Sequence, residues 1–333
     1  MRYHRVQSFG FARALVRAAL LFWCVLSLTF VLLRLAPGDA ATFLVPEGAS
    51  AIEVARVRAT LGLDSSIPVQ YARWLDESLH GRLGASFVER RAVSAVIGDA
   101  LPVSLGLGAA SLLLSFVAGT IVGLVQAARR GSKTDSALTV ASVVLVASPA
   151  YWLGLGAIAC FTYLASSWNF PLALRLPAIG MATPGADLHG VAYLADLARH
   201  AILPITLLAA IGAGGVARYV RTGALDTMRA DWMRSARAKG ASEQRVFGLH
   251  LLSNLGAPLL TLLALALPGT VAGSVFVETI FAWPGMGRLM VTSIIARDYP
   301  VVIGCAAAFA LIVIVANLAA EALLPWADPR VRG

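Results

Sequence analysis

The chain has 333 residues, of which 58% are hydrophobic and only 14% are charged. Soluble domains usually carry about 25% charged residues, so this chain lacks the polar surface that a water-soluble globule needs. Its net charge of +9 would fit nucleic acid only if the positive residues shared one face, whereas they lie in short segments between apolar runs. Composition therefore excludes a soluble domain and predicts a lipid-embedded protein that has no nucleic acid as a partner.

Apolar runs long enough to cross a bilayer recur along the chain. Crossing needs about 20 apolar residues, because a helix rises about 1.5 Å per residue and the hydrocarbon core is about 30 Å thick. Prolines such as Pro149, Pro204 and Pro268 lie inside these runs, and packed membrane helices tolerate them. About six runs qualify, which predicts an all-α, multi-pass membrane protein with helices at 14–35, 101–128, 137–165, 201–220, 255–281 and 301–324.

The first run has a basic start, as a cleaved signal peptide would. Its apolar stretch is long, however, and Leu35-Ala-Pro-Gly38 is a poor match to a small-residue cleavage site. We therefore expect a retained membrane helix that follows a short cytosolic segment.

The distribution of lysine and arginine predicts the orientation. If the N-terminus is cytosolic, most of the 27 basic residues fall on the cytosolic side, whereas the outer connections are close to neutral. This asymmetry predicts that both termini are cytosolic. The cytosolic groups are Arg2, Arg5, Arg13 and Arg17; Arg129, Arg130 and Lys133; Arg218, Arg221, Arg229, Arg234, Arg237, Lys239 and Arg245; and Arg330 and Arg332.

The first outer connection, 37–100, is long and less apolar than the runs that flank it. Within it, Ser50–Leu61 has the spacing of a short amphipathic helix, with Val54 and Val57 on its apolar side. We expect this connection to form a small extracytoplasmic cap. The later outer connection, 166–199, contains proline and glycine and is typical of a loop.

Motifs for catalysis, metal binding and nucleotide binding are absent from the sequence. It contains no GxxxxGK[ST] phosphate loop, GxSxG elbow or HExxH pair, and its five histidines and three cysteines are scattered. Glu278 and Glu321 are among the few charged residues in the runs, and both lie near run ends. An ion-coupled carrier usually buries several ionisable residues at mid-membrane, so their scarcity favours a passage driven from elsewhere. The alternative for Glu278 is a structural role at a helix end.

Pairs of small residues indicate where helices approach closely. Gly119 and Gly123, and likewise Gly269 and Gly273, place two glycines on one helix face. The denser run Gly212–Gly215 is compatible with close packing and also with a flexible segment near a pathway.

The loop between the fourth and fifth runs carries the most specific pattern. Asp231 can cap a helix, Gly240 can end it, and Ser242 can begin the next one. The sequence thus predicts a helix, a sharp turn and a second helix at the membrane face. Such a rigid unit could transmit motion from a soluble partner, and the alternative is an amphipathic basic helix lying on anionic lipid.

This loop resembles the EAA coupling motif of ABC importer permeases, in the form found in the dipeptide, oligopeptide and nickel branch. The resemblance implies that it docks a cytosolic ATPase. Its matching residues are Asp231, Trp232, Ser235, Ala236, Arg237, Ala238, Lys239, Gly240, Val246, His250, Leu252 and Asn254.

Other segments are similar to the same family, in particular to the permease that has a long first periplasmic loop. They are Arg34–Asp39, Leu61–Asp64 with Pro68, Gln70 and Tyr71, Arg297–Val302, and Asp328–Arg332. A periplasmic family motif follows the fifth run and includes Glu278, Trp283, Pro284, Gly285 and Gly287.

The resemblance implies a type I ABC importer permease in a bacterial inner membrane, and not an enzyme in itself. A second homologous permease, two ATPases that bind the ATP, and a periplasmic solute-binding protein would be its partners, with no cofactor or metal. The implied cargo is di- or oligopeptides; nickel chelates, glutathione, other small solutes and a stand-alone carrier or channel are the alternatives. The implied parts are 1–36, a cap at 37–100, a core at 101–325 with a coupling loop at 223–254, and a cytosolic tail at 326–333.

The chain departs from the family pattern at a few positions. Gly81-Arg-Leu-Gly84 stands where the family usually has Gly-Asp-[Leu/Phe]-Gly, so Arg82 reverses a charge on the outer side. Glu321 and Pro325 replace an aspartate and a tyrosine near the end of the last run. These changes concern the partner and the cargo rather than the fold.

Overall fold

The computed structural model describes residues 2–36, 40–46, 48–171, 174–229, 240 and 251–327. This described part is mostly helical and contains no strand, only an isolated bridge between Ala85 and Ala92. The chain divides into two compact units. The first unit comprises 1–103 and 285–315, and the second comprises 104–284 and 316–333.

The first unit contains the long N-terminal helix and the helices of the outer connection. Ser50 caps α3 by accepting a hydrogen bond from the Glu53 N–H, and the Glu53 carboxylate accepts one from the Ser50 N–H. This reciprocal cap explains why the predicted helix begins where it does. The elements are α1 (Arg2–Leu35), α2 (Ala40–Leu44), α3 (Ala51–Thr60), α4 (Ile67–Leu79), the start of α5 (Val93–Ala128), α13 (Met286–Ile295) and most of α14 (Tyr299–Ala327).

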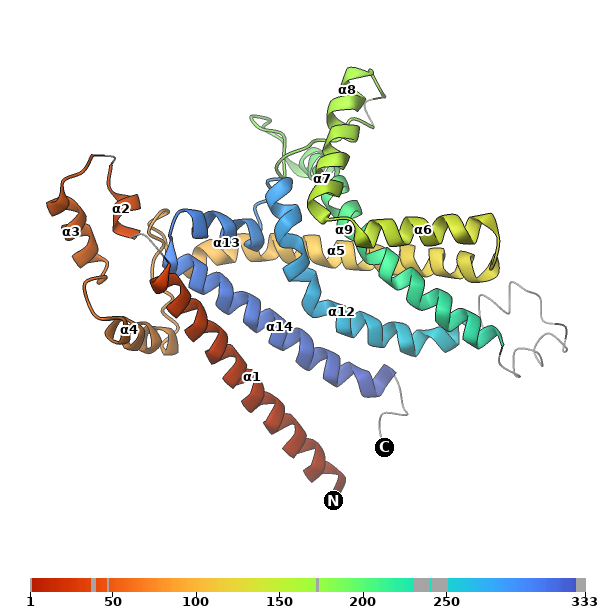
Figure 1. Cartoon of the computed structure of the whole chain (residues 1–333), viewed down its shortest axis with the longest axis horizontal. Helices are drawn as coiled ribbons and strands as arrows, with labels where there is room; N and C mark the ends of the chain where they lie inside the picture. Colours follow the sequence, from red (N-terminus) through yellow and green to blue (C-terminus); the bar gives the residue numbers. More distant parts are fainter. Residues whose placement is uncertain are drawn as a thin grey trace. The chain divides into compact units, whose positions relative to one another are not determined.

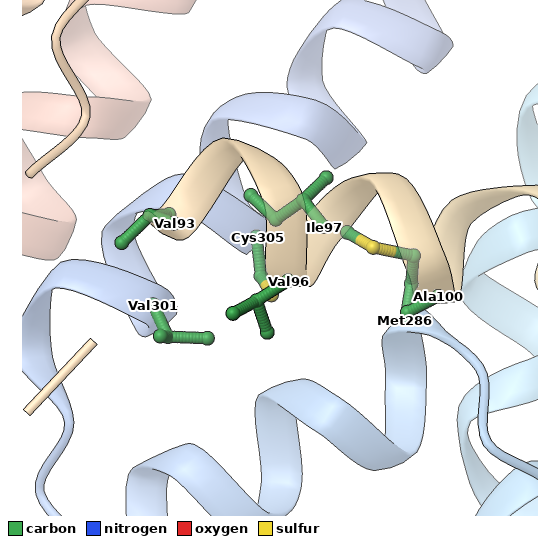
Figure 2. Close-up of a cluster of buried hydrophobic side chains, with 7 residues drawn as sticks. All are labelled: Val93, Val96, Ile97, Ala100, Met286, Val301 and Cys305. Carbon is green, nitrogen blue, oxygen red and sulfur yellow. The ribbon is translucent and has the colours of Figure 1, made fainter. Parts of the chain in front are cut away.

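The core of the first unit forms where α5, α13 and α14 meet (Figure 2). Side chains from the first turns of α5 point toward α14, and Met286 of α13 closes the cluster. A Cβ on Gly304 would lie 2.6 Å from Val93 Cγ1, so α14 can approach α5 this closely only with glycine there. The cluster consists of Val93, Val96, Ile97, Ala100, Met286, Val301 and Cys305.

The second unit is a helical bundle built on the rest of α5. In Figure 1, α6 runs back alongside the end of α5, and α9 lies next to both. Ser132 caps the start of α6 by accepting a hydrogen bond from the Asp135 N–H at 3.2 Å. The elements are α6 (Lys133–Ala147), α7 (Ala150–Ile158), a π-helical turn η1 (Ala159–Leu164), α8 (Ala165–Ser167), α9 (Gly190–Met228) and α12 (Leu252–Ile280).

The prediction of one continuous helix over 137–165 is wrong. Helix α6 ends at Ala147, Ser148 and Pro149 are extended with ψ of 137° and 129°, and α7 begins at Ala150. Proline disfavours the helical conformation of the preceding residue, so Ser148 leaves the helix. Pro102 and Pro204, by contrast, lie inside the continuous helices α5 and α9.

Five helices of the described part are long and apolar enough to cross a membrane: Leu15–Leu35, Val93–Ala128, Ala150–Ser167, Gly190–Met228 and Tyr299–Ala320. They overlap five of the predicted runs. Helix α9 begins at Gly190, inside the connection that was expected to be a loop up to residue 199. Helix α12 covers the remaining run, and Leu255–Leu267 is the apolar part of it that lies within the described residues. The total of about six spans therefore stays a prediction.

Candidate functional site

The predicted coupling loop lies mostly outside the described residues. Asp231, Trp232, Ser235, Ala236, Arg237, Ala238, Lys239 and His250 fall outside them, and Asn254 is described only as part of the α12 backbone. Gly240 is described, and its φ of +83° lies in the left-handed region. Glycine adopts this conformation without the penalty that a Cβ imposes, which agrees with the turn expected at this position.

The helices on either side of the loop pack against each other. Val220 and Ala224 of α9 are fully buried against Leu251 and Leu255 at the start of α12. Ala127 of α5 belongs to the same cluster. The helix that leads into the loop and the helix that follows it thus meet at one apolar base.

An ion pair that sequence reasoning missed fixes this base. Arg221 of α9 donates to both carboxylate oxygens of Asp135 on α6, with Nε–Oδ1 at 2.9 Å and Nη2–Oδ2 at 2.8 Å. The Gly131 N–H donates to Asp135 Oδ2 at 3.0 Å. The Asp135 side chain is only 6% exposed and that of Arg221 is 30% exposed, so the carboxylate of this bidentate pair is the partner that is shielded from water. The pair ties the α5–α6 turn to α9 about two helical turns before that helix ends at Met228.

The pair predicts a pH dependence. The hydrogen bonds from Arg221 and then from the Gly131 N–H lower the pKa of Asp135 from 3.8 to about 2. A lowered pKa means that the stabilisation is fully present above about pH 4 and disappears as the pH falls through about 2. The melting temperature of the wild type should therefore exceed that of Asp135→Asn by a constant amount above pH 4, and the difference should shrink below it. An unchanged difference down to pH 2 would contradict the assignment.

Glycines allow α9 to approach its neighbours at backbone distance. A Cβ on Gly119 would lie 2.8 Å from the Ala213 carbonyl oxygen, and one on Gly123 would lie 2.6 Å from that of Ala217. The predicted close approach of this pair is therefore confirmed. In the run Gly212–Gly215, Gly212 contacts Ser115 and Gly214 contacts the Ser142 carbonyl, whereas Gly215 has open space. Close packing thus accounts for these two glycines. Gly269 meets nothing within 4 Å, so its predicted packing role finds no contact within the described chain.

Glu278 of the predicted periplasmic motif is fully buried near the end of α12. Its Oε1 accepts hydrogen bonds from Ser104 Oγ of α5 at 2.7 Å and from Ser274 Oγ at 2.8 Å. Its backbone oxygen accepts from the Trp283 N–H at 2.8 Å. The carboxylate is therefore held by hydroxyl groups from two helices, which is the structural role considered as the alternative, with side chains rather than backbone as partners.

The other motif residues follow this helix end in the chain. Trp283 is buried, and its Nε1 has no acceptor among the described residues. Pro284 is exposed, whereas Gly285 and Gly287 are buried, and Gly285 precedes the first residue of α13. Glu321 lies in α14, and its side chain and that of Pro325 fall outside the described residues.

A second unpredicted anchor lies in the first unit. Asp298 is 2% exposed and accepts hydrogen bonds from the Ser86 hydroxyl and from the N–H groups of Phe87 and Val88, the latter two at 3.1 and 3.2 Å. It thereby fixes the turn that follows Arg82 to the start of α14. The resemblance to the family included the segment Arg297–Val302, which contains Asp298. It did not indicate the residues that bind Asp298, because they lie more than 200 positions earlier in the chain.

The described residues contain no group of His, Cys, Asp or Glu side chains that could hold a metal ion. They provide a packed helical base next to the predicted coupling loop, the Asp135–Arg221 ion pair, and the buried carboxylates of Glu278 and Asp298. This arrangement can transmit mechanical displacement, since each contact joins two helices.

Comparison with known proteins points to one family. The model described as "Binding-protein-dependent transport system inner membrane component" matches residues 119–333, and the model of the N-terminal part of such components matches residues 8–108. The oligopeptide transport system permease protein AppB of Bacillus subtilis is 35% identical over 305 residues, which cover 91% of this chain and 93% of AppB. A protein of Escherichia coli named "Probable D,D-dipeptide transport system permease protein DdpB" is 35% identical over 315 residues, 92% of each chain.

A solved structure shows the same fold. A chain of the MetNI methionine ABC transporter in an inward-facing conformation superposes with a TM-score of 0.52 at 16% identity. The match covers 70% of this chain and 96% of that one. At this identity the likeness establishes the permease fold and nothing about cargo.

Proposed function

Because this chain belongs to the family of inner membrane components of binding-protein-dependent transport systems, we propose that it is a permease subunit of an ABC importer for di- or oligopeptides. The observation that carries the cargo class is its 35% identity, over nearly the full length of both chains, with relatives named for oligopeptide and D,D-dipeptide transport. The family is the membrane component of the transporter and not its ATPase.

Coupling in this proposal starts at the loop 223–254, which docks a cytosolic ATPase through Trp232 and the segment Ser235–Gly240. Closure of the ATPases on ATP pulls the loop. The packing of Val220 and Ala224 against Leu251 and Leu255 supports a direct transfer of this displacement to α9 and α12. The Asp135–Arg221 pair supports transfer from α9 to the α5–α6 turn. Helices held at several points move as bodies, which is what alternating access requires.

Both termini lie in the cytosol in the proposed topology, and the chain crosses the inner membrane about six times. The excess of lysine and arginine in the connections 129–133 and 218–245 supports this orientation. It places the cap 37–100 and the motif from Glu278 to Gly287 on the periplasmic side, the core at 101–325, and the ends 1–13 and 326–333 inside.

The complete transporter contains a second homologous permease, two ATPases and a periplasmic solute-binding protein. The family description, which names a binding-protein-dependent system, supports the last of these partners. The motif from Glu278 to Gly287 forms part of the periplasmic gate in this proposal. The burial of Glu278 between Ser104 and Ser274 supports a gate element that is set by helix packing.

The cargo class is tested by uptake in a strain that lacks only this chain. We expect labelled di- and tripeptides to stop accumulating, while nickel, glutathione and a glycoside enter at the wild-type rate. Complementation with the wild-type chain should restore peptide uptake. Normal peptide uptake in the deletion strain, together with loss of one of the other solutes, would reassign the cargo.

A further inference from the structure

Helix α4 lies beside α1. The residue of α1 that it contacts indicates how deep α4 lies in the membrane. The hydroxyl oxygens of Ser27 on α1 and Tyr71 on α4 are 2.6 Å apart, and the rings of Phe30, Tyr71 and Trp74 lie within 5.4–5.7 Å of one another. Ser27 is inside the apolar segment Leu15–Leu35, about two helical turns, or roughly 12 Å, from its end. On the proposed topology, α4 therefore lies within the outer leaflet rather than above the membrane.

The exposed residues of α4 include three that are apolar as well as the charged Asp76, whose side chain is 69% exposed. Ile67, Val69 and Leu79 are apolar and 40%, 43% and 78% exposed, and Val31 and Leu35 of α1 are exposed nearby. Acyl chains can cover these apolar side chains, whereas water would leave them exposed at a cost.

A cavity of about 330 Å³ opens between α1, α4, the segment after Arg82 and the start of α14. Its lining combines the aromatic rings of Trp74 and Tyr299 with the guanidinium groups of Arg34, Arg73 and Arg82 and the carboxylate of Glu77. The Arg34 guanidinium lies over the Tyr299 ring at 5.2 Å, which holds it in place. Among the described residues, neither Arg73 nor Arg82 forms an ion pair or a side-chain hydrogen bond.

A neighbouring cavity of about 420 Å³ gives a useful contrast. Arg58 and Asp64 line it and pair with each other, with Nε–Oδ1 at 3.4 Å. The charges of this pair compensate each other, and Arg34 lines this cavity as well, whereas Arg73 and Arg82 of the first cavity have no such ion pair among the described residues. Guanidinium groups bind phosphate groups, as they bind carboxylates, through two parallel N–H···O hydrogen bonds.

We propose that this cavity binds the phosphoethanolamine headgroup of an outer-leaflet phospholipid. Arg73 and Arg82 hold the phosphate, Glu77 accepts hydrogen bonds from the ammonium, and the exposed apolar side chains of α1 and α4 contact the acyl chains. Arg82 is also the residue that departs from the family pattern, and this site gives its charge a role other than contact with a partner or with the cargo. The bound lipid would fix the cap 37–100 against α1.

The experiment measures lipid retained by the transporter complex after purification in mild detergent, with native mass spectrometry. Phosphatidylethanolamine, phosphatidylcholine and phosphatidylglycerol are added in equal amounts. The test variant is Arg73→Gln/Arg82→Gln, and the matched control is Arg56→Gln, which removes an exposed arginine of α3 that lines neither cavity. We expect the double variant to retain roughly tenfold less phosphatidylethanolamine, as loss of exposed charge-assisted hydrogen bonds would give, and the control to match the wild type.

Glu77→Gln provides a second readout. Because the choline group has no N–H to donate, the wild type should prefer phosphatidylethanolamine over phosphatidylcholine, and this variant should lose the preference. Equal retention by the wild type and the double variant would overturn the proposal. So would displacement of the lipid by millimolar inorganic phosphate, which would indicate a free-anion site. Unchanged lipid retention with loss of a soluble partner would instead indicate protein docking. The mass of bound lipid is measured without any transport assay. If the assignment of peptides as cargo fails, the lipid result is therefore unaffected.

Discussion

Replacing Gly240 with leucine should lower ATP-driven peptide uptake by roughly tenfold or more, which lies within the range of typical coupling free energies. Gly240 has a φ of +83°, and a residue with a Cβ pays about 1–2 kcal/mol to adopt that conformation. The leucine side chain would also enlarge the surface that we assign to ATPase docking. Membrane insertion should be unchanged and ATP hydrolysis should continue, because neither depends on this turn. Peptide uptake and ATP hydrolysis, measured on the same membrane preparation, give the number of peptides taken up per ATP hydrolysed.

A matched control separates backbone strain from loss of coupling. Gly185 lies in the connection before α9, also has a positive φ of +75°, and also has nothing within 4 Å of a built Cβ. Gly185→Leu therefore introduces similar strain away from the coupling loop and should retain uptake. Normal uptake by Gly240→Leu, or an equal loss in the two variants, would contradict the role assigned to the loop.

Replacing Gly123 with alanine should destabilise the bundle by about 1–3 kcal/mol, the usual range for overpacking. The added Cβ would lie 2.6 Å from the Ala217 carbonyl oxygen and 2.7 Å from Val220 Cβ, so α5 and α9 must move apart. Since Val220 belongs to the base of the coupling loop, the displacement also reaches that base. Thermal unfolding of the purified chain in detergent, followed by tryptophan fluorescence, measures the effect.

Gly106→Ala is the control on the same helix. Nothing lies within 4 Å of a Cβ built on Gly106, so the substitution adds only helix propensity and should be neutral or stabilising by about 0.5–1 kcal/mol. Equal melting temperatures for Gly123→Ala and the wild type would show that the two helices do not depend on this contact.

The helices could be predicted from apolar length because lipid leaves few alternatives to a helix. This reasoning placed α1, α5, α9 and α14, and it placed Gly119 and Gly123 at a helix contact. It did not predict the break at Pro149. Apolar length cannot distinguish this proline from Pro102 and Pro204, which stand in similar apolar sequence and remain helical. Whether a proline breaks a membrane helix depends on which neighbouring groups satisfy the freed backbone, and that is a tertiary property.

The contacts that join distant segments could not be predicted. Asp135 and Arg221 are separated by 86 positions and Ser86 and Asp298 by 212, and many other charged residues in the chain could have been their partners. The predicted coupling loop is the opposite case, because its motif is clear in the sequence while most of its residues lie outside the described part of the chain. Its residues form the most specific motif of the sequence, but among them only Gly240 and the helical backbone of Leu252 and Asn254 are described, so the docking role of the loop stays a proposal.

The most direct test of the central claim is peptide accumulation in proteoliposomes that contain either this chain alone or the complex that co-purifies with it. We expect accumulation of a labelled dipeptide only in vesicles that contain the complex, and only with both ATP on the ATPase side and the binding protein on the other. Uptake by the chain alone without ATP would contradict the account and identify a stand-alone carrier.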